Sequence, residues 1–346
     1  MKLKSSLTLA AISLSLLTQT AQAEIKILSS IRPIYYLVEG VNQGISQQEL
    51  LVGGNISPHD YQPKPSDIQK IKNADIIFRI DDDFQPRFTK LFSANMDNAP
   101  LISLADIDGL KLLPNAAHLK AEHDEEDEEH HEEGEEHHEE GEEHHEEGEE
   151  HHEEGEEHHE EGEHGHDHSA NEFDLHIWLS PSNAIKITNE VALQLSKLDP
   201  TNREKYQYNA KQQVEHLRQL NLNLQQQLSP FKDQYFFSYH DAYSYYTENF
   251  GLKHSVAITP TLSHQLSAHK MQEILDAGQQ KSINCVMLEP QFSDKLARTV
   301  AKNNDKAQIN SWDPLGFDLE LKANSYHILL KNMTTNLTKC LSKPNR

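Results

Sequence analysis

The sequence of 346 residues predicts an α/β fold of two lobes with mostly parallel sheets, joined by one long rigid helix. Short β-rich runs alternate with helical stretches on both sides of residues 199–229. Within 199–229, apolar side chains recur at spacings of three and four, which defines one face of a helix about 42 Å long. Without the signal and the insert described below, about 270 residues remain, more than one domain usually holds. We therefore expect an N-terminal lobe at 24–198, a connecting helix at 199–229 and a C-terminal lobe at 230–346.

Residues 1–23 have the features of a secretory signal peptide. Two lysines give a positive start, residues 7–17 form an apolar core, and Ala-Gln-Ala at 21–23 fits a small-x-small cleavage site. The core is too short to span a bilayer comfortably, although an uncleaved anchor is the alternative. No lipobox cysteine follows, so we expect neither a lipid anchor nor a membrane span after signal removal. The mature chain is expected to begin at Glu24, outside the cytoplasm.

The elements of the two lobes follow from the same patterns. In the N-terminal lobe we expect strands at 25–28, 76–80 and 101–104 and a helix at 65–72. A short apolar segment at 175–179 precedes Ser180-Pro181, a helix start with proline near the first turn. In the C-terminal lobe we expect a helix from about Ala242 and strands at 235–238, 255–258, 283–288 and 308–311. Ligands of such sheets bind near the carboxyl ends of the strands.

A repetitive acidic segment interrupts the N-terminal lobe. The motif EEHHEEG occurs in five tandem copies from Glu128 to Gly162. The window 118–168 holds more than half of the 23 histidines and nearly half of the 56 acidic residues, so it carries essentially the whole net charge of −25. It has almost no apolar residue, so we expect 118–170 to be a disordered insert. Imidazole and carboxylate together indicate metal binding, and the alternative is a low-complexity expansion that binds metal incidentally. The histidines expected to bind metal weakly are His130, His131, His137, His138, His144, His145, His151, His152, His158, His159, His164, His166 and His168.

Three histidines outside this tract occupy loop or strand-end positions with distinctive neighbours. His59 lies in SPHDY, His176 in DLHIWLSP, and His240 follows a predicted strand in SYHDAY. Three separated loops that each present one imidazole could close on one metal ion. For each residue alone, a hydrogen-bonded structural histidine is the alternative, because the spacing matches no HExxH helix.

Several longer motifs carry a resemblance to a known family. They are PHDYQPKPSD at 58–67, NAD at 73–75, LHIWLSP at 175–181, YHDAYSYY at 239–246, EPQF at 289–292 and WDPLG at 312–316. With these motifs, and with a His- and acid-rich insertion before the second ligand motif, the chain resembles the periplasmic zinc-uptake binding proteins of the ZnuA kind, which serve ABC importers. The resemblance extends from about residue 25 to about residue 341.

The resemblance implies a set of metal ligands. His59, His176 and His240 would be the zinc ligands, and the fourth position would be taken by Asp313 or by water. Some relatives have an acidic residue directly before the first histidine, but here Pro58 stands there and cannot coordinate through its side chain.

Three acidic residues are candidates for the surroundings of these ligands, where a carboxylate often orients a ligating imidazole. They are Asp60, Asp241 and Glu289. For Asp60 and Asp241, which directly follow ligand histidines, helix N-capping is the alternative. Three imidazoles suit Zn²⁺, whereas Mn²⁺ prefers sites richer in oxygen. Because imidazole must be neutral to bind, affinity should fall below a pH of about 6.5.

Two cysteines, Cys285 and Cys340, are present in a chain expected to be exported. One disulfide is the simplest expectation, with two buried thiols as the alternative. On the chain-entropy model such a long loop contributes about 4 kcal/mol.

The resemblance implies a periplasmic protein that captures Zn²⁺ between its lobes and delivers it to a membrane permease with a cytoplasmic ATPase. We expect no catalysis, no nucleic-acid partner and a monomer. The alternatives are an extracytoplasmic metal buffer whose function is the tract, a manganese- or iron-binding relative and, more remotely, a secreted zinc hydrolase. A zinc hydrolase would also use three protein ligands and a water, but the sequence has no HExxH motif.

Overall fold

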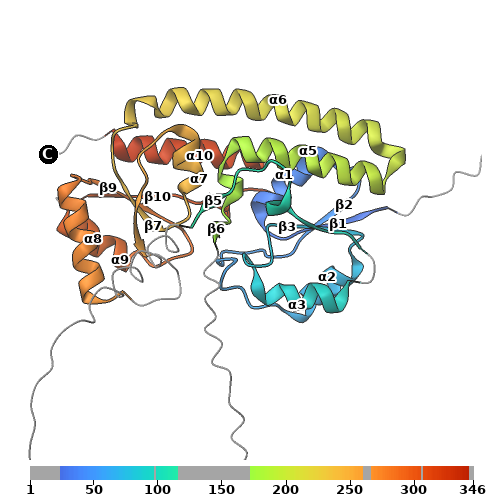
Figure 1. Cartoon of the computed structure of the whole chain (residues 1–346), viewed down its shortest axis with the longest axis horizontal. Helices are drawn as coiled ribbons and strands as arrows, with labels where there is room; N and C mark the ends of the chain where they lie inside the picture. Colours follow the sequence, from blue (N-terminus) through green and yellow to red (C-terminus); the bar gives the residue numbers. More distant parts are fainter. Residues whose placement is uncertain (1–23, 97–98, 116–171, 260–265, 305–306, 343–346) are drawn as a thin grey trace, which may run out of the picture.

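The computed structural model describes residues 24–96, 99–115, 172–259, 266–304 and 307–342. Within them, two parallel sheets lie side by side beneath a layer of long helices (Figure 1). The predicted α/β fold, with mostly parallel sheets and a long helix, is confirmed. The expected signal peptide at 1–23 and the expected His/Glu-rich insert at 118–170 lie outside the described residues.

The first sheet is formed by the N-terminal part of the chain. Its four strands are parallel and lie in the order β2-β1-β3-β4, so the strand order reverses at β1. The strands are β1 (Lys26–Ser29), β2 (Gln47–Leu50), β3 (Ile76–Arg79) and β4 (Leu101–Ser103). The helices are α1 (Arg32–Asn42), α2 (Pro65–Asn73) and α3 (Pro86–Asn95), each with a proline in its first turn, where its fixed φ suits the helix.

The second sheet repeats this plan in the C-terminal part. Its order is β10-β9-β7-β8, all parallel, and the reversal falls at β7. The strands are β7 (Phe237–His240), β8 (Val256–Thr259), β9 (Cys285–Leu288) and β10 (Gln308–Ser311). The helices beside it are α7 (Ser244–Phe250), α8 (Ala268–Gln280) and α9 (Lys295–Asn303). Ligands of open parallel sheets bind at such reversal points, outside the carboxyl ends of the strands.

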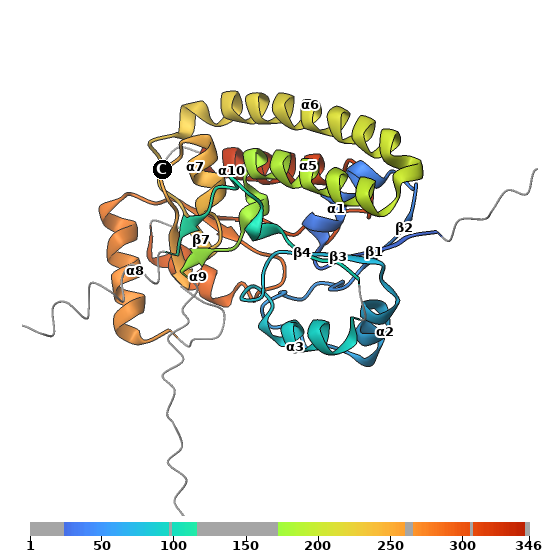
Figure 2. The ribbon, with the colours of Figure 1, turned by 45° about the vertical axis from the view of Figure 1, so that its right-hand side comes forward.

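Three long helices form a layer over the sheets, as Figures 1 and 2 show. They are α5 (Pro181–Leu198), α6 (Arg203–Leu228) and α10 (Ser325–Leu341). Helix α6 runs along both sheets, α5 lies on the side of the first sheet, and α10 lies mainly on the side of the second. The predicted start of α5 is confirmed, because the Ser180 hydroxyl accepts a hydrogen bond from the Asn183 N–H at 3.3 Å. α6 has 26 residues, a length of about 39 Å. The apolar residues whose spacing predicts one helical face are all buried, whereas Leu222, which falls off that face, is 58% exposed; the buried residues are Tyr206, Ala210, Val214, Leu217, Leu220, Leu224 and Leu228.

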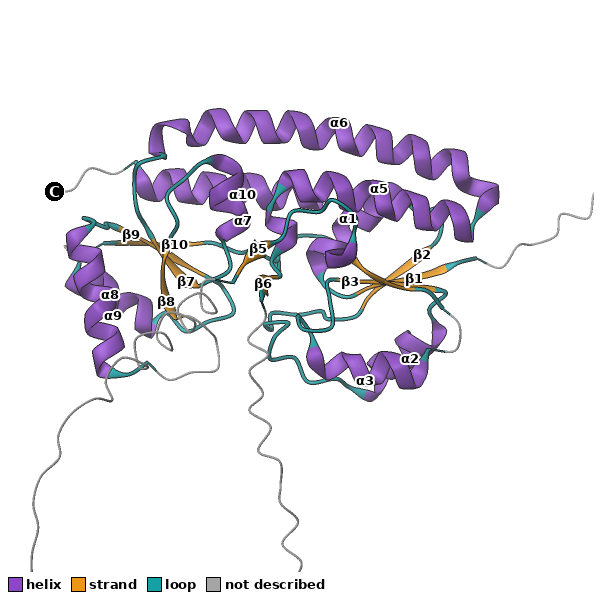
Figure 3. Cartoon of the chain, in the orientation of Figure 1, coloured by secondary structure: helices purple, strands orange, loops and turns teal. Residues whose placement is uncertain are grey.

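One hydrophobic core runs continuously from the first sheet to the second. It joins residues such as Ile77 of β3 and Leu217 of α6 to Trp312 and Leu337. A smaller core on the second sheet alone packs Phe237 against α8 and α9. Figure 3 shows the resulting layers, with the strands between the long helices and the shorter outer helices. The shared core restricts how far the two sheets can move relative to each other.

A disulfide links Cys285 at the start of β9 to Cys340 in α10. It confirms the expected pairing, closes a separation of 55 residues and fixes α10 against the second sheet. Both cysteines are buried. No helix among the described residues combines the length and apolar character needed to cross a membrane.

Candidate metal centre

Three histidines from separate parts of the chain meet between the two sheets. His59 lies in the loop between β2 and α2, and His240 is the last residue of β7, at the reversal point of the second sheet. His176 lies between the short strand β6 (Phe173–Asp174) and a 3₁₀ turn, Ile177–Leu179. One ring nitrogen of each histidine lies within 4.8 Å of the other two. The structure therefore brings together the three histidines that the sequence singled out.

Carboxylates hold two of the three rings. The Asp174 Oδ1 atom lies 2.7 Å from His176 Nδ1 and also accepts the backbone N–H of His176. The Glu289 Oε1 atom contacts His240 Nδ1, and both side chains are buried. Because a carboxylate only accepts, each Nδ1 carries the proton and each Nε2 is left with a lone pair. The sequence singled out Glu289 correctly as a neighbour of a ligand histidine.

The ring nitrogens of the three histidines converge on one point between the sheets. His59 Nε2 and His176 Nε2 are 3.3 Å apart, and His240 Nε2 is buried with no hydrogen-bond partner among the described residues. Two nitrogens bound to one tetrahedral Zn²⁺ at 2.0–2.1 Å would be about 3.3 Å apart. The spacing of His59 and His176 already matches that geometry. A bound cation would satisfy the lone pair of His240 Nε2, whose burial without a partner is otherwise costly.

The electrostatics of the three rings differ. Burial, followed by the proximity of His176 and His240, holds the pKa of His59 well below its ordinary value. Burial alone would also lower the pKa of His240, but the charge and hydrogen bond of Glu289 outweigh it, and the pKa of His240 is raised. The His59 ring is therefore neutral and able to bind a cation at neutral pH. The His240 ring is protonated in a larger fraction of metal-free molecules and must lose that proton when a cation binds.

An apolar wall closes the site to anything larger than an ion. Phe84 packs edge-on against His59 and Trp178, with ring centroids 4.6 and 5.4 Å apart. Pro58, Pro314 and Leu315 complete the wall, and the space left among these residues and the histidines is about 10 Å³. That is room for about one water molecule or one ion. A larger groove of about 690 Å³ between α5 and α6 has no histidine in its lining.

Asp313 is not brought into the histidine group. Its Oδ1 atom accepts the N–H groups of Leu315 and Gly316 at 2.9 and 2.8 Å, and its Oδ2 atom accepts that of Phe317 at 2.7 Å. The carboxylate thus closes the turn after Trp312, and it belongs neither to the group of three nor to the small cavity. Burial raises the pKa of Asp313, although the three N–H groups act in the opposite direction.

The other acidic residues near the ligands have different positions. Asp60 is exposed, and Asp241 is partly buried next to His240. Neither is a helix N-cap, since Lys64 precedes α2 and Tyr243 precedes α7. Sequence reasoning missed Asp174, which holds His176. Its signal was available, because an acidic residue two positions before a candidate ligand can fold back onto it.

Comparison with known proteins gives the family of the chain. The family model described as the zinc-uptake complex component A, periplasmic, matches residues 27–340. The chain belongs to this family. The high-affinity zinc uptake system protein ZnuA of Haemophilus influenzae is 38% identical over 341 residues, covering 99% of this chain and all of the relative. The ZnuA protein of Brucella suis is 37% identical over 318 residues, covering 92% of each chain. In fold, the chain is similar to a solved ZnuA deletion mutant with zinc bound, with a TM-score of 0.70, 22% identity and coverage of 93% of this chain and 99% of the other.

Membership of this family identifies the chain as a solute-binding component of a periplasmic zinc-uptake system.

Proposed function

We propose that this chain captures one Zn²⁺ between its two lobes through the Nε2 atoms of His59, His176 and His240, and delivers the ion to the permease of an ABC importer with its cytoplasmic ATPase. The observation that carries the proposal is the convergence of three imidazoles whose ligand nitrogens lie within 4.8 Å of one another. In this reading, residues 24–198 and 230–346 are the lobes and 199–229 is the connecting helix.

The donor set supports zinc rather than manganese or iron. Three neutral imidazoles suit Zn²⁺, and no carboxylate of the described residues joins the group. Asp313 is engaged by backbone N–H groups, so we propose water rather than Asp313 at the fourth position. The relatives of this chain are described as high-affinity zinc uptake proteins, and the solved deletion mutant of similar fold holds zinc.

The small cavity favours capture over catalysis. A hydrolase needs space for a substrate beside the metal and a general base within reach of the bound water. Here about 10 Å³ remains beside the histidines, and Phe84 and Trp178 wall it. The carboxylates of Asp174 and Glu289 are already bonded to ring nitrogens. We therefore propose a binding protein without enzymatic activity. The monomeric state and the lack of a nucleic-acid partner expected from the sequence stay part of the proposal.

Zinc titration of a variant that lacks residues 118–168 tests the proposal. We expect one tight equivalent, identified as zinc by elemental analysis of protein purified with mixed metals. Replacing His240 by Ala in this variant should lower the affinity by orders of magnitude. Replacing His269, an exposed histidine paired with Glu273 on α8, is the matched control and should change nothing.

Two results would contradict the proposal. If the His240→Ala variant kept its affinity, the three-histidine site would be wrong. If deletion of residues 118–168 abolished the tight equivalent, the metal-buffer function would be favoured, with the lobes as a scaffold for the tract.

A further inference from the structure

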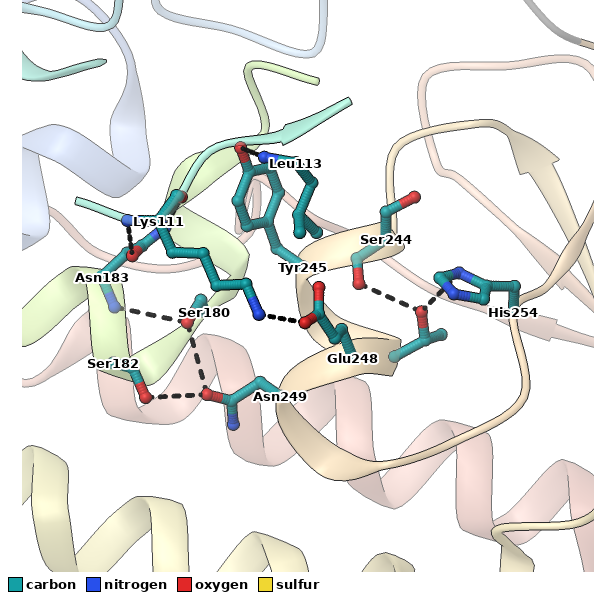
Figure 4. Close-up of polar contacts among 11 residues, drawn as sticks. Lys111, Leu113, Ser180, Ser182, Asn183, Ser244, Tyr245, Glu248, Asn249 and His254 are labelled. Carbon is teal, nitrogen blue, oxygen red and sulfur yellow. Dashed lines mark hydrogen bonds and ion pairs between the residues drawn. The ribbon is translucent and has the colours of Figure 1, made fainter. Parts of the chain in front are cut away.

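Tyr245, on helix α7 beside the second sheet, is hydrogen-bonded to the segment that carries His176. The strands β5 (Leu113–Pro114) and β6 (Phe173–Asp174) form a two-residue antiparallel ladder in which Leu113 is paired with Asp174. The Tyr245 hydroxyl of α7 accepts the backbone N–H of Leu113 at 3.0 Å and donates to the backbone carbonyl of Asp174 at 2.6 Å. One phenol therefore binds both members of a ladder pair, as Figure 4 shows for Leu113.

Asp174 connects this phenol to the metal site. Its carboxylate oxygen accepts both the backbone N–H and the Nδ1–H of His176. Tyr245 is thus two hydrogen-bonded steps from the imidazole ring. The tyrosine is 2% exposed and Asp174 is 7% exposed, so solvent cannot replace either contact at low cost. Burial raises the pKa of Tyr245, so its hydroxyl stays protonated and can donate.

Other contacts cross this seam without reaching a ligand histidine. Lys111 forms an ion pair with Glu248, and both side chains are more than a third exposed. The hydroxyls of Ser180 and Ser182 donate to Asn249 Oδ1 at 3.3 and 3.0 Å (Figure 4). An exposed ion pair such as Lys111–Glu248 contributes little and is screened by salt. Among the contacts drawn along the seam, the buried phenol is the one that leads to a ligand histidine.

We propose that Tyr245 is a positioning residue for zinc capture, which fixes Asp174 and through it the orientation of the His176 imidazole. This inference rests on the proposed function, since it takes His176 as a zinc ligand. The phenol comes from the C-terminal lobe, whereas the chain that carries His176 arrives from the N-terminal lobe. Tyr245 therefore sets the position of one lobe's ligand from the other lobe.

The test is a pair of matched variants, Tyr245→Phe and Tyr246→Phe. Tyr246 lies on the same helix and is fully buried, and its hydroxyl is 2.6 Å from the Thr334 hydroxyl on α10 rather than on the His176 segment. Each change removes one buried phenolic oxygen and keeps the ring. Changes in residues that orient metal ligands typically cost 10–100-fold in affinity, so we expect Tyr245→Phe to weaken zinc binding by about tenfold. Tyr246→Phe should bind zinc as the unaltered protein does.

Two further readouts separate positioning from general support of the fold. The d–d absorption of Co²⁺ bound in place of zinc should change in Tyr245→Phe and not in Tyr246→Phe. In a double-mutant cycle of Tyr245→Phe with Asp174→Asn, the effects of the two substitutions on zinc affinity should be less than additive, because both act through the His176 ring. Equal affinity in both tyrosine variants, or full additivity with Asp174→Asn, would overturn the proposal.

A measurement on metal-free protein distinguishes this inference from the proposed function. The Nδ1 proton of His176 should give a slowly exchanging NMR signal that is lost in Tyr245→Phe and kept in Tyr246→Phe. If that signal were unchanged by Tyr245→Phe, the positioning role would be refuted whatever the metal. If the unaltered protein bound no zinc while the signal behaved as expected, the proposed function would fail and the positioning of His176 would stand.

Discussion

Replacing Glu289 by Gln should weaken zinc binding without disturbing the fold. Glu289 is completely buried, its Oε1 atom contacts His240 Nδ1, and its Oε2 atom accepts the Gln291 Nε2–H at 2.7 Å. Glutamine has nearly the same size, so the change creates no cavity. It removes the negative charge behind His240 and places a donor where Gln291 now donates. The amide oxygen can still accept the His240 Nδ1–H, so the ring keeps an acceptor but loses the negative charge that supports it, and the new amide N–H competes with Gln291.

The expected magnitude follows from these contacts. Replacing a partner that orients a ligand histidine typically lowers metal affinity by 10–100-fold, or about 1.4–2.8 kcal/mol. We expect the upper half of that range at pH 8, because the pair is buried and the charge on Glu289 is poorly screened.

The pH dependence has a definite sign. Burial would lower the pKa of His240, but Glu289 raises it above the ordinary value, so in the metal-free protein a proton competes with zinc for this ring. Glu289→Gln removes that support and lowers the pKa of His240. Protons therefore compete less with zinc in the variant. The difference in zinc affinity between the variant and the parent protein should become smaller as the pH falls from about 8 to about 5.5.

The assay is competition with a chromophoric chelator, in protein lacking residues 118–168. Glu273→Gln is the control, because Glu273 pairs with His269 at an exposed position far along the sequence from the ligands. It should leave the affinity unchanged. Equal affinity for Glu289→Gln and the parent protein at pH 8, or a deficit that widens as the pH falls, would refute the reasoning.

Three further predictions concern the rest of the molecule. Zinc titration of the intact chain should be biphasic, and deletion of residues 118–168 should remove only the weak phase; a second tight equivalent in the deleted protein would contradict this. Reduction of the Cys285–Cys340 disulfide opens a separation of 55 residues and should lower stability by about 4 kcal/mol, seen as a melting temperature roughly 10 °C lower; an unchanged melting curve would exclude a stabilising bridge. Burial holds the pKa of His327 at about 4, so the folded state loses stability as the pH falls from about 6.5 to 4. His327→Leu should reduce this acid-induced loss of unfolding free energy, measured by urea unfolding, by about 2 kcal/mol. Equal loss in the variant and the parent protein would contradict the prediction.

The sequence was sufficient for elements with strong patterns. The seven predicted β-rich runs, three in the N-terminal part and four in the C-terminal part, correspond to strands β1, β3, β4, β7, β8, β9 and β10. The spaced apolar residues of α6 form one buried face. The edge strand β2 was not predicted, because its sequence QQEL has one apolar residue and is only partly buried. Its pairing with β1 comes from tertiary context rather than from its own pattern.

The site was predicted in part. His59, His176 and His240 were singled out by their loop and strand-end positions, but those positions alone did not place them near one another; the family resemblance did. Asp313 was a candidate fourth ligand because it lies in the WDPLG motif. Its carboxylate instead accepts hydrogen bonds from the backbone N–H groups of the turn that follows it. Which backbone N–H groups compete with a metal for a carboxylate depends on the local backbone geometry, and the spacing of residues in the sequence does not reveal that geometry. Tyr245 contacts the His176 segment from 71 residues further along the chain, so no local pattern reports it.

The most direct test of the account is a crystal structure of the protein lacking residues 118–168, loaded with one equivalent of zinc and measured with anomalous diffraction at the zinc edge. The account predicts one strong peak about 2.0–2.1 Å from the Nε2 atoms of His59, His176 and His240, with Asp313 outside the coordination sphere. A peak that lacks any of the three histidines, or that lies elsewhere on the chain, would contradict it.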